Sequence, residues 1–267
     1  MLAVGSSITP LAAAAQSVTL QIHPRHGDTV HTRLEQRMEV TAADMAGHAR
    51  GRPLVTSVAI YSRTIVLSSM PANSTVLTVV DSALMHTTDS HGAEQVDAAE
   101  RMLQGQRIRL QLAIDGSVEN ASDAGGRPVA RELADAMAGM PAIFPRHPVR
   151  VGEEWTREMP LPTSGPFGAR GLGYVSARFR LDSLVQNGRI AVVSMQGVIR
   201  PASSTDGVQL SGSIGGTMHL DRARGWMTGS QVTVVVRSVV TPSPGTGRGP
   251  MRFVTRVTQR LRTMDKR

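Results

Sequence analysis

The stretch LEQRMEV, residues 34–40, alternates in character with a period of two residues. Its odd-numbered residues are charged, whereas Leu34, Met38 and Val40 share the other face. Successive side chains of a strand point to opposite faces, so this pattern is typical of a strand with one buried and one solvated face. The stretch predicts a half-buried β-strand, and with it a β-rich fold.

The same alternation continues on both sides of this stretch. Upstream, alternating apolar residues predict a strand over residues 17–23. Downstream, two long β-rich segments, residues 54–69 and 75–87, flank a turn signal at Pro71-Ala72-Asn73. Beyond the middle of the chain, Asn187-Gly188 is a hairpin signal between two further alternating segments. The glycines at 212, 215 and 216 lie inside a strand pattern, which indicates strong curvature or close backbone approach.

The last alternating segment carries a row of arginines on one face. Phe253, Val257 and Leu261 alternate with charged positions, so they belong to the opposite face. The arginines on the first face are Arg252, Arg256, Arg260 and Arg262. Such a face is a candidate contact surface for an anionic partner.

Two helices interrupt the strand pattern near the middle of the chain. Residues 93–103 place Val96 and Leu103 at helical spacing, and Gly105 ends the helix. Residues 128–140 form a second helical pattern, with Pro128 suited to the first turn. The apolar stripe of this second helix consists of Val129, Leu133, Met137 and Met140.

These patterns together predict a mainly β (α+β) fold. We expect about 9–10 long antiparallel strands in a single strongly curved sheet or unclosed β-barrel, with the two helices covering its concave face. No composition break divides the chain, so residues 17–267 are predicted to form one β-rich domain.

The composition limits the classes of function. The formal net charge is +8, yet aromatic residues make up only 3% of the chain and the arginines are scattered. Base-stacking platforms are therefore scarce, and we expect no nucleic-acid partner. The chain has no cysteine, so neither a disulfide nor a lipid anchor on cysteine is available to it.

The first 16 residues are interpreted as a signal-peptide remnant or a disordered N-terminus. The small residues Ala12 to Ala15 precede Gln16 and resemble the end of a secretory signal, although the usual basic start is missing. We therefore expect an exported bacterial protein, periplasmic or secreted, and not one that spans the membrane, because no long apolar run is present.

The segment FPRHPVRVGEEW, residues 144–155, gathers charged and aromatic side chains but does not predict an active site. The two prolines favour extended chain, and Val149, Val151 and Trp155 are predicted to alternate into a strand, with Trp155 as a packing anchor. The histidines near residue 23 lack a matched second pair of ligands. We expect no catalytic residues, no metal site and no cofactor.

A methionine-rich cluster is the candidate ligand site. Core packing is the simpler interpretation of these side chains, and the alternative is a soft, ring-poor surface suited to an acyl chain. The candidate ligand-binding residues are Met102, Val129, Leu133, Met137 and Met140.

Several short patterns in this order resemble uncharacterised exported bacterial families, domains of unknown function related to the periplasmic lipoprotein-carrier fold. The patterns are Asp115-Gly116, Phe144-Pro145, Val149-x-Val151-Gly152-x-x-Trp155 and Gly215-Gly216-x-x-x-Leu220-Asp221-x-x-x-Gly225. The resemblance spans most of residues 17–264 and implies an unclosed β-barrel with a helical lid over a cavity for acyl chains. It carries over no catalytic residue.

Two functions follow as hypotheses. The first is a non-enzymatic periplasmic or cell-envelope protein, monomeric, that binds an apolar ligand such as a lipid or a lipoprotein acyl chain. The alternative is a structural or interaction protein of the cell envelope with a filled core and no small-molecule ligand. In the alternative, the arginine face of the last strand contacts an anionic partner.

Overall fold

The computed structural model describes residues 17–89, 92–124, 142–160, 173–201, 208–240 and 249–264. Its strands form one antiparallel sheet of eleven members. They are β1 (Thr29–Ala43), β2 (Leu54–Ser69), β3 (Asn73–Thr87), β4 (Arg107–Ala113), β5 (Val118–Asp123), β6 (Glu154–Pro160), β7 (Gly173–Val185), β8 (Ile190–Pro201), β9 (Val208–Asp221), β10 (Trp226–Val240) and β11 (Met251–Met264). The mainly β, unclosed fold is confirmed, with eleven strands in place of the expected 9–10.

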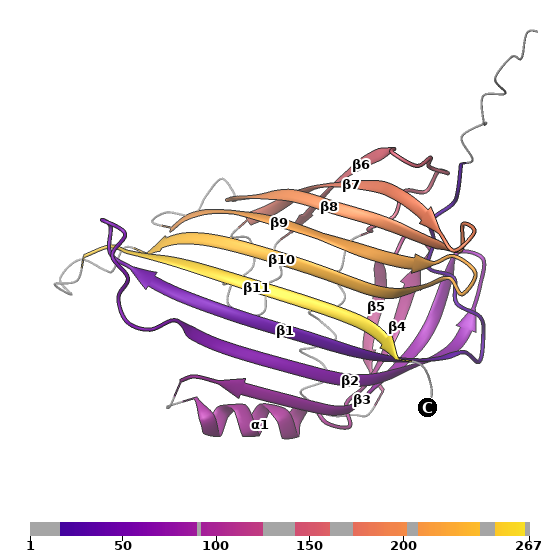
Figure 1. Cartoon of the computed structure of the whole chain (residues 1–267). Helices are drawn as coiled ribbons and strands as arrows, with labels where there is room; N and C mark the ends of the chain where they lie inside the picture. The colour runs from indigo at the N-terminus through magenta and orange to yellow at the C-terminus, as the bar shows by residue number, and fades with distance from the viewer. Residues whose placement is uncertain are drawn as a thin grey trace, which may run out of the picture.

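The order of the strands places the first and the last side by side. The sheet reads β5-β4-β3-β2-β1-β11-β10-β9-β8-β7-β6, so every neighbour except the β1–β11 pair is consecutive in sequence. In that pair, Glu35 lies opposite Arg260 and Glu39 lies opposite Arg256. Figure 1 shows this junction in the middle of the sheet, where the indigo β1 meets the yellow β11. The molecule therefore consists of two strand runs joined by one central seam.

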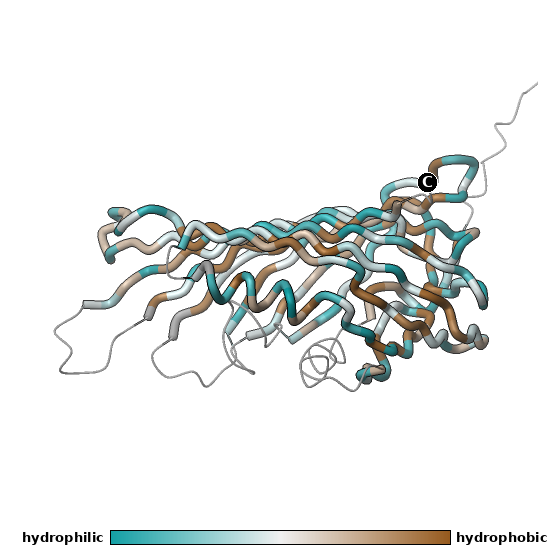
Figure 2. The backbone as a smooth tube through the Cα atoms, turned by 90° about the horizontal axis from the view of Figure 1, so that it is seen from below, coloured by the Kyte–Doolittle hydropathy of each residue, from teal (hydrophilic) through white to brown (hydrophobic). Residues whose placement is uncertain are grey.

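The sheet has an apolar inner face and a polar outer face. In β4 the inner face is defined by Ile108 and Leu110, which are buried, while Arg107 and Arg109 point outward and are exposed. In β8 and β9, Val193 and Leu220 are buried on the same inner face. Along the central strands hydrophobic and hydrophilic residues alternate (Figure 2). The predicted period-two patterning is thus the one that builds the sheet.

Glycines allow the sheet to curve tightly at β9. A Cβ atom on Gly212 would lie 2.2 Å from the Val235 carbonyl oxygen, and one on Gly216 would lie 2.2 Å from that of Gln231. Neither position tolerates a side chain without a shift of the neighbouring strand. β4 and β5 lie behind the central strands (Figure 1), so the sheet curls around its inner face. The close backbone approach predicted from these glycines is confirmed.

Residues 17–27 form an extended strap across one end of the curled sheet, not the strand predicted over residues 17–23. The Val18 amide donates to Val149 (2.8 Å), that of Ile22 to Ile114 (2.8 Å) and that of His23 to Gly225 (2.9 Å). Each bond goes to a different part of the chain, so no ladder forms. We call the crossed end, where β9 turns into β10, the closed end.

The helix α1 (Ala93–Leu103) confirms the first of the two expected helices. It packs against β3 at the edge that β4 leaves unpaired, since β4 pairs only with residues Asn73 to Val79. The Glu100 carboxylate accepts a hydrogen bond from the Met85 amide, and Val80 exchanges backbone bonds with Gly105 and Gln106. The helix therefore protects a strand edge, which would otherwise expose unpaired amides. The second expected helix, residues 128–140, lies outside the described residues.

The segment 144–155 connects the strap to β6. Phe144 and Val149 are buried, and the Trp155 indole donates to the Ile143 carbonyl oxygen (2.8 Å) while its ring stacks on Phe179 at 5.8 Å. Trp155 as a packing anchor is confirmed. The strand predicted through Val151 is not formed there, because the chain turns at Gly152 with a φ of 89° and β6 begins at Glu154.

Candidate binding faces of the sheet

The inner face of the central strands carries large apolar side chains that are only partly buried, together with Gln36 and Gln259, which lie opposite each other. Leu34 of β1 pairs with Ile60 of β2 and with Leu261 of β11, so three large aliphatic side chains lie side by side. All three are of intermediate exposure, as are Met38 and Val58 on the same face. A core residue would be buried, so apolar side chains that remain exposed in this way mark a candidate contact surface.

The closed end is different, because there the inner face is fully packed. Leu181, Ala191 and Val193 are 0% exposed, and the strap adds Leu20 at 1%. Trp226 contacts both the cluster on β6–β9 and the smaller cluster on β3–β5. The inner face is therefore a filled core at the closed end and stays accessible around Leu34, Ile60 and Leu261. Further from that end it is buried again, at Val236, Thr255 and Val257.

Asp221 anchors the β9–β10 turn at the closed end. Its carboxylate accepts two hydrogen bonds from Arg189, at 3.0 and 2.7 Å, and two from the Ala223 and Arg224 amides. Burial acts to raise the pKa of Asp221, but the hydrogen bonds from Arg189 and from these amides outweigh burial and lower the pKa below its ordinary value. Asp221 is therefore a stably ionised structural group, unsuited to act as a general acid or base near neutral pH.

Asp115 plays the same role in the β4–β5 turn. Its carboxylate accepts bonds from the Ser117 hydroxyl (2.7 Å) and from Arg146 (3.0 Å). Burial again acts to raise the pKa, and the bonds from Ser117 and Arg146 outweigh it, so the pKa of Asp115 lies below its usual value. The charge of Arg146, within the 144–155 segment, therefore stabilises this turn.

The outer face carries arginines that lack acidic partners. The β11 arginines predicted to share one face do so, and all four are exposed. Their nearest cross-strand carboxylates on β1 are already engaged, because Glu35 pairs with Arg33 and Glu39 lies 3.9 Å from Arg37. Within the described part of the chain, no ion pair reaches Arg252, Arg256, Arg260 or Arg262.

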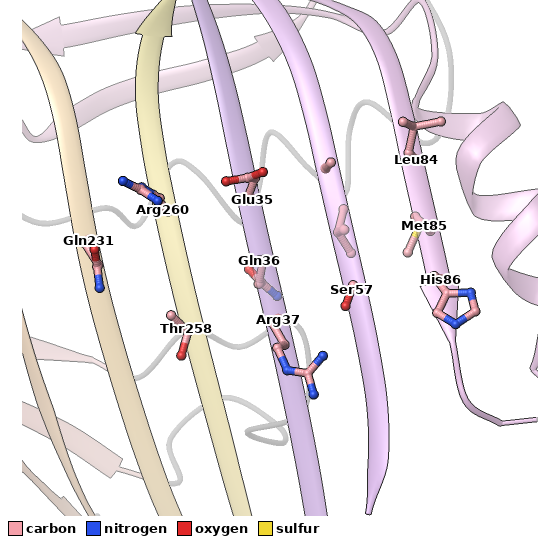
Figure 3. A pocket seen from close by; sticks show the side chains of 12 residues that line it. Glu35, Gln36, Arg37, Ser57, Leu84, Met85, His86, Gln231, Thr258 and Arg260 are labelled. Carbon is pink, nitrogen blue, oxygen red and sulfur yellow. The ribbon is translucent and has the colours of Figure 1, made fainter.

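A hollow of about 530 Å³ lies on this outer face, over β10, β11, β1, β2 and β3. Its floor includes Ser57 and Ala59, and Arg37 and Arg260 line it. Figure 3 shows that the two arginine side chains point away from one another, toward opposite sides of the hollow. The arrangement offers separate positive groups around an open surface and not two donors converging on one small anion.

The structure describes one of the five residues predicted to bind a ligand. Met102 lies in the last turn of α1 and is 47% exposed, while Val96 and Leu103 are the apolar residues of that helix with lower exposure. The other four, Val129, Leu133, Met137 and Met140, lie outside the described residues. Sequence reasoning missed the inner-face residues of the central strands as ligand candidates, although their period-two pattern was visible in the segments around Leu34 and Leu54.

The described residues hold neither a cluster of the kind that binds a metal nor a helix that could span a membrane. No three histidine, aspartate or glutamate side chains there converge in the manner of a metal site. Among the same residues no helix has the length and apolar character needed to cross a bilayer.

No protein-family model and no curated protein matches the chain. Among solved structures, "Lipid-protein interactions in lipovitellin" is similar with a TM-score of 0.52 at 6% identity, over 90% of this chain. DynF from the dynemicin biosynthesis pathway of Micromonospora chersina has a TM-score of 0.24 at 9% identity, over 97% of this chain and 92% of its own. The outer membrane protein OprG from Pseudomonas aeruginosa has a TM-score of 0.22 at 8% identity, over 91% of this chain and 98% of its own.

The likeness to lipovitellin shows the fold alone. This chain spans about a quarter of that chain's length, 25%. The other two scores are too low to support a structural argument. A large open sheet is thereby shared with a known structure, whereas the predicted relation to the lipoprotein-carrier fold stays a prediction.

Proposed function

We propose that the protein binds an apolar ligand, such as an acyl chain of a lipid or lipoprotein, against the inner face of its central strands. The observation that carries the proposal is the change in burial along this face. The same kind of side chain is fully buried at the closed end and partly exposed at Leu34, Ile60 and Leu261. An accessible apolar surface of this kind marks a ligand or partner site more often than it marks idle surface.

The chemistry of the inner face suits a flexible ligand. Around Leu34 it combines aliphatic and methionine side chains with the polar pair Gln36 and Gln259, and Met38 lies beside the buried Val257. Aliphatic and methionine side chains adapt to chains of varying shape, whereas ring-lined pockets select fixed shapes. The fold shared with lipovitellin, whose structure concerns lipid–protein interactions, supports the same class of ligand.

The helical residues named from sequence are part of the proposal. Val129, Leu133, Met137 and Met140 would supply a lid over the ligand, and Met102 is exposed enough to contact it. The proposal also keeps the expected setting, a periplasmic or cell-envelope protein that reaches its site by export. The relation to the lipoprotein-carrier fold belongs to the same proposal.

The test begins with the protein produced with an export signal and purified without detergent. Organic extraction and mass spectrometry of the extract, beside a native mass spectrum, are expected to show a stoichiometric lipid. Met38→Gln on the inner face and Met137→Asp in the expected lid should each reduce lipid retention at least about tenfold, because each places a polar group against the ligand.

Arg37→Gln is the matched control, since it makes a similar side-chain change one residue away on the outer face. It should retain the lipid. A wild-type protein that is clean and takes up no lipid afterwards would overturn the proposal and favour the interaction protein with a filled core. Far-UV circular dichroism and the urea midpoint distinguish lost binding from lost folding.

A further inference from the structure

We propose that the outer face of β10, β11 and β1 docks onto an anionic lipid surface, with the β11 arginines as its main contacts. This inference goes beyond the apolar ligand site, because it concerns the opposite face of the sheet. It does not depend on whether the inner face holds a lipid.

The first observation is uncompensated positive charge along one strand. Arg252 and Arg262 are ten residues apart, so the row of arginines extends over about 34 Å. The carboxylates of β1 that lie opposite are engaged by Arg33 and Arg37 of their own strand. The row therefore keeps its charge available for groups outside the protein. Arg237 on β10 lies opposite Val254 and adds another exposed arginine beside the row.

The second observation is the identity of the cation. The chain has one lysine, at position 266, and all the cations of the row are arginines. A guanidinium group matches the oxygens of a phosphate with two parallel hydrogen bonds and is less strongly hydrated than an ammonium group. A row of guanidinium groups is therefore suited to bind phosphate groups that are spread over a plane.

The third observation favours a lipid surface over a dissolved polyanion. Apolar side chains are exposed on the same outer face: Val254 at 37% within the row, and further out Val198 of β8 at 45% and Leu84 of β3 at 57%. Val254 lies between Arg252 and Arg256 on the same face of β11. Alternating cationic and apolar contacts suit the boundary between headgroups and acyl chains, whereas a nucleic-acid backbone offers nothing for the apolar groups.

Nucleic acid is the competing partner, and the aromatic content of this face disfavours it. In the described part of the chain, the strand registers place Tyr61 and Tyr174 on the outer face. The Arg33 guanidinium lies over the Tyr61 ring at 5.3 Å, which occupies that ring as a stacking surface. Tyr174 is 52% exposed but lies on β7, three strands from β10, so it gives the arginine row no ring on which a base could stack. The divergent arginines around the 530 Å³ hollow likewise favour many dispersed anions over one.

Vesicle sedimentation tests the proposal with the full chain. Wild-type protein is expected to sediment with vesicles that contain phosphatidylglycerol and not with pure phosphatidylcholine, and added salt should release it because the contact is electrostatic. Replacing the four β11 arginines together by glutamine should weaken the association on the order of a hundredfold. The same variant should keep its inner-face lipid in the extraction experiment, which separates this surface from the proposed ligand site.

A second quadruple variant controls for net charge. It replaces four exposed arginines elsewhere by glutamine and should still sediment with the anionic vesicles; these are Arg25, Arg50, Arg101 and Arg150. Equal loss in both variants would overturn the assignment to this face. Wild-type protein that ignores anionic vesicles at low salt overturns the proposal as a whole. If such protein binds a duplex oligonucleotide instead, the partner is nucleic acid.

Discussion

Single residues decide whether the closed end holds together. Asp221 binds Arg189 from the β7–β8 turn, so two neighbouring hairpins are joined through one buried carboxylate. Its side chain is 2% exposed, whereas Arg189 is 47% exposed. Solvent therefore screens the charge of the arginine but not that of the aspartate. Removing Asp221 destabilises the protein mainly because the hydrogen bonds of this buried turn are lost.

Asp221→Ala should lower the free energy of unfolding by about 3 kcal/mol, because it removes buried, charge-assisted hydrogen bonds to Arg189 and to two amides. Urea denaturation at pH 7 measures the change. Glu154→Ala is the control, since Glu154 forms an ion pair with Arg178 at 3.6 Å on the exposed outer face. It should cost less than about 1 kcal/mol. Equal costs would show that the buried turn contributes nothing special.

At the scale of the elements, β9 bends because two of its glycines face inward. Gly216 lies between Met195 and Val232, whose side chains are on the inner face. Gly215, one residue earlier, belongs to the outer face, where a Cβ atom would meet nothing closer than 3.7 Å. Adjacent glycines thus have opposite tolerance for a side chain.

Gly216→Ala should destabilise the protein by about 1–3 kcal/mol or prevent folding, because the new methyl group forces β9 and β10 apart. Gly215→Ala should be neutral or stabilising by about 0.5 kcal/mol, since it removes only backbone freedom. Thermal unfolding of the two variants side by side checks the contrast. A tolerated Gly216→Ala would mean that the curvature does not depend on this contact.

The elements also show what a sequence can predict. The segment around Leu34 reveals its period-two pattern locally, because a strand exposes alternate side chains whatever its neighbours are. The strap at residues 17–27 carries the same alternation, yet its amides bond to four separate parts of the chain, at Val149, Ile114, Gly225 and Val66. Local pattern reports which side chains are buried but not whether a neighbouring strand is present. The strap was therefore mistaken for a strand, although its buried residues were identified correctly.

The two candidate faces were also predicted from the sequence to different extents. The arginine row of β11 is a local pattern and was predicted. The β1–β11 register places Glu35 opposite Arg260 and Glu39 opposite Arg256. Both glutamates nevertheless bind arginines of their own strand. Strand pairing over such a separation leaves no local signal. The partly exposed inner face was missed for the same reason, because exposure there depends on how the whole sheet curls.

The molecule as a whole has one tightly packed end, which the strap crosses. Both acidic turns lie at the packed end: Asp115 on the β4–β5 hairpin and Asp221 on the β9–β10 hairpin. The strap bonds to both hairpins, through Ile114 and Gly225. The ionised carboxylates of Asp115 and Asp221 therefore stabilise the packed end, on which the curled shape depends.

This arrangement predicts an acid-sensitive fold. Because the folded pKa values of Asp115 and Asp221 lie below their ordinary values, their stabilisation is complete above the unfolded pKa of about 3.9 and is lost as pH falls through the folded pKa values. The urea midpoint should be constant near neutral pH and fall below about pH 4. The double variant Asp115→Asn/Asp221→Asn should start lower and show a flatter acid limb. Parallel profiles would assign the acid sensitivity to other groups.

The central seam also has a consequence for synthesis on the ribosome. Of the eleven strands that the structure describes, β1 is made first, and its partner β11 follows all the others. Until then β1 presents a long unpaired edge, and such edges invite pairing with other chains. The nascent protein must keep that edge occupied or shielded through the translation of nearly all other strands. Alternating charges at Arg33, Glu35, Arg37 and Glu39 are the kind of residue that discourages intermolecular pairing while β1 waits for β11.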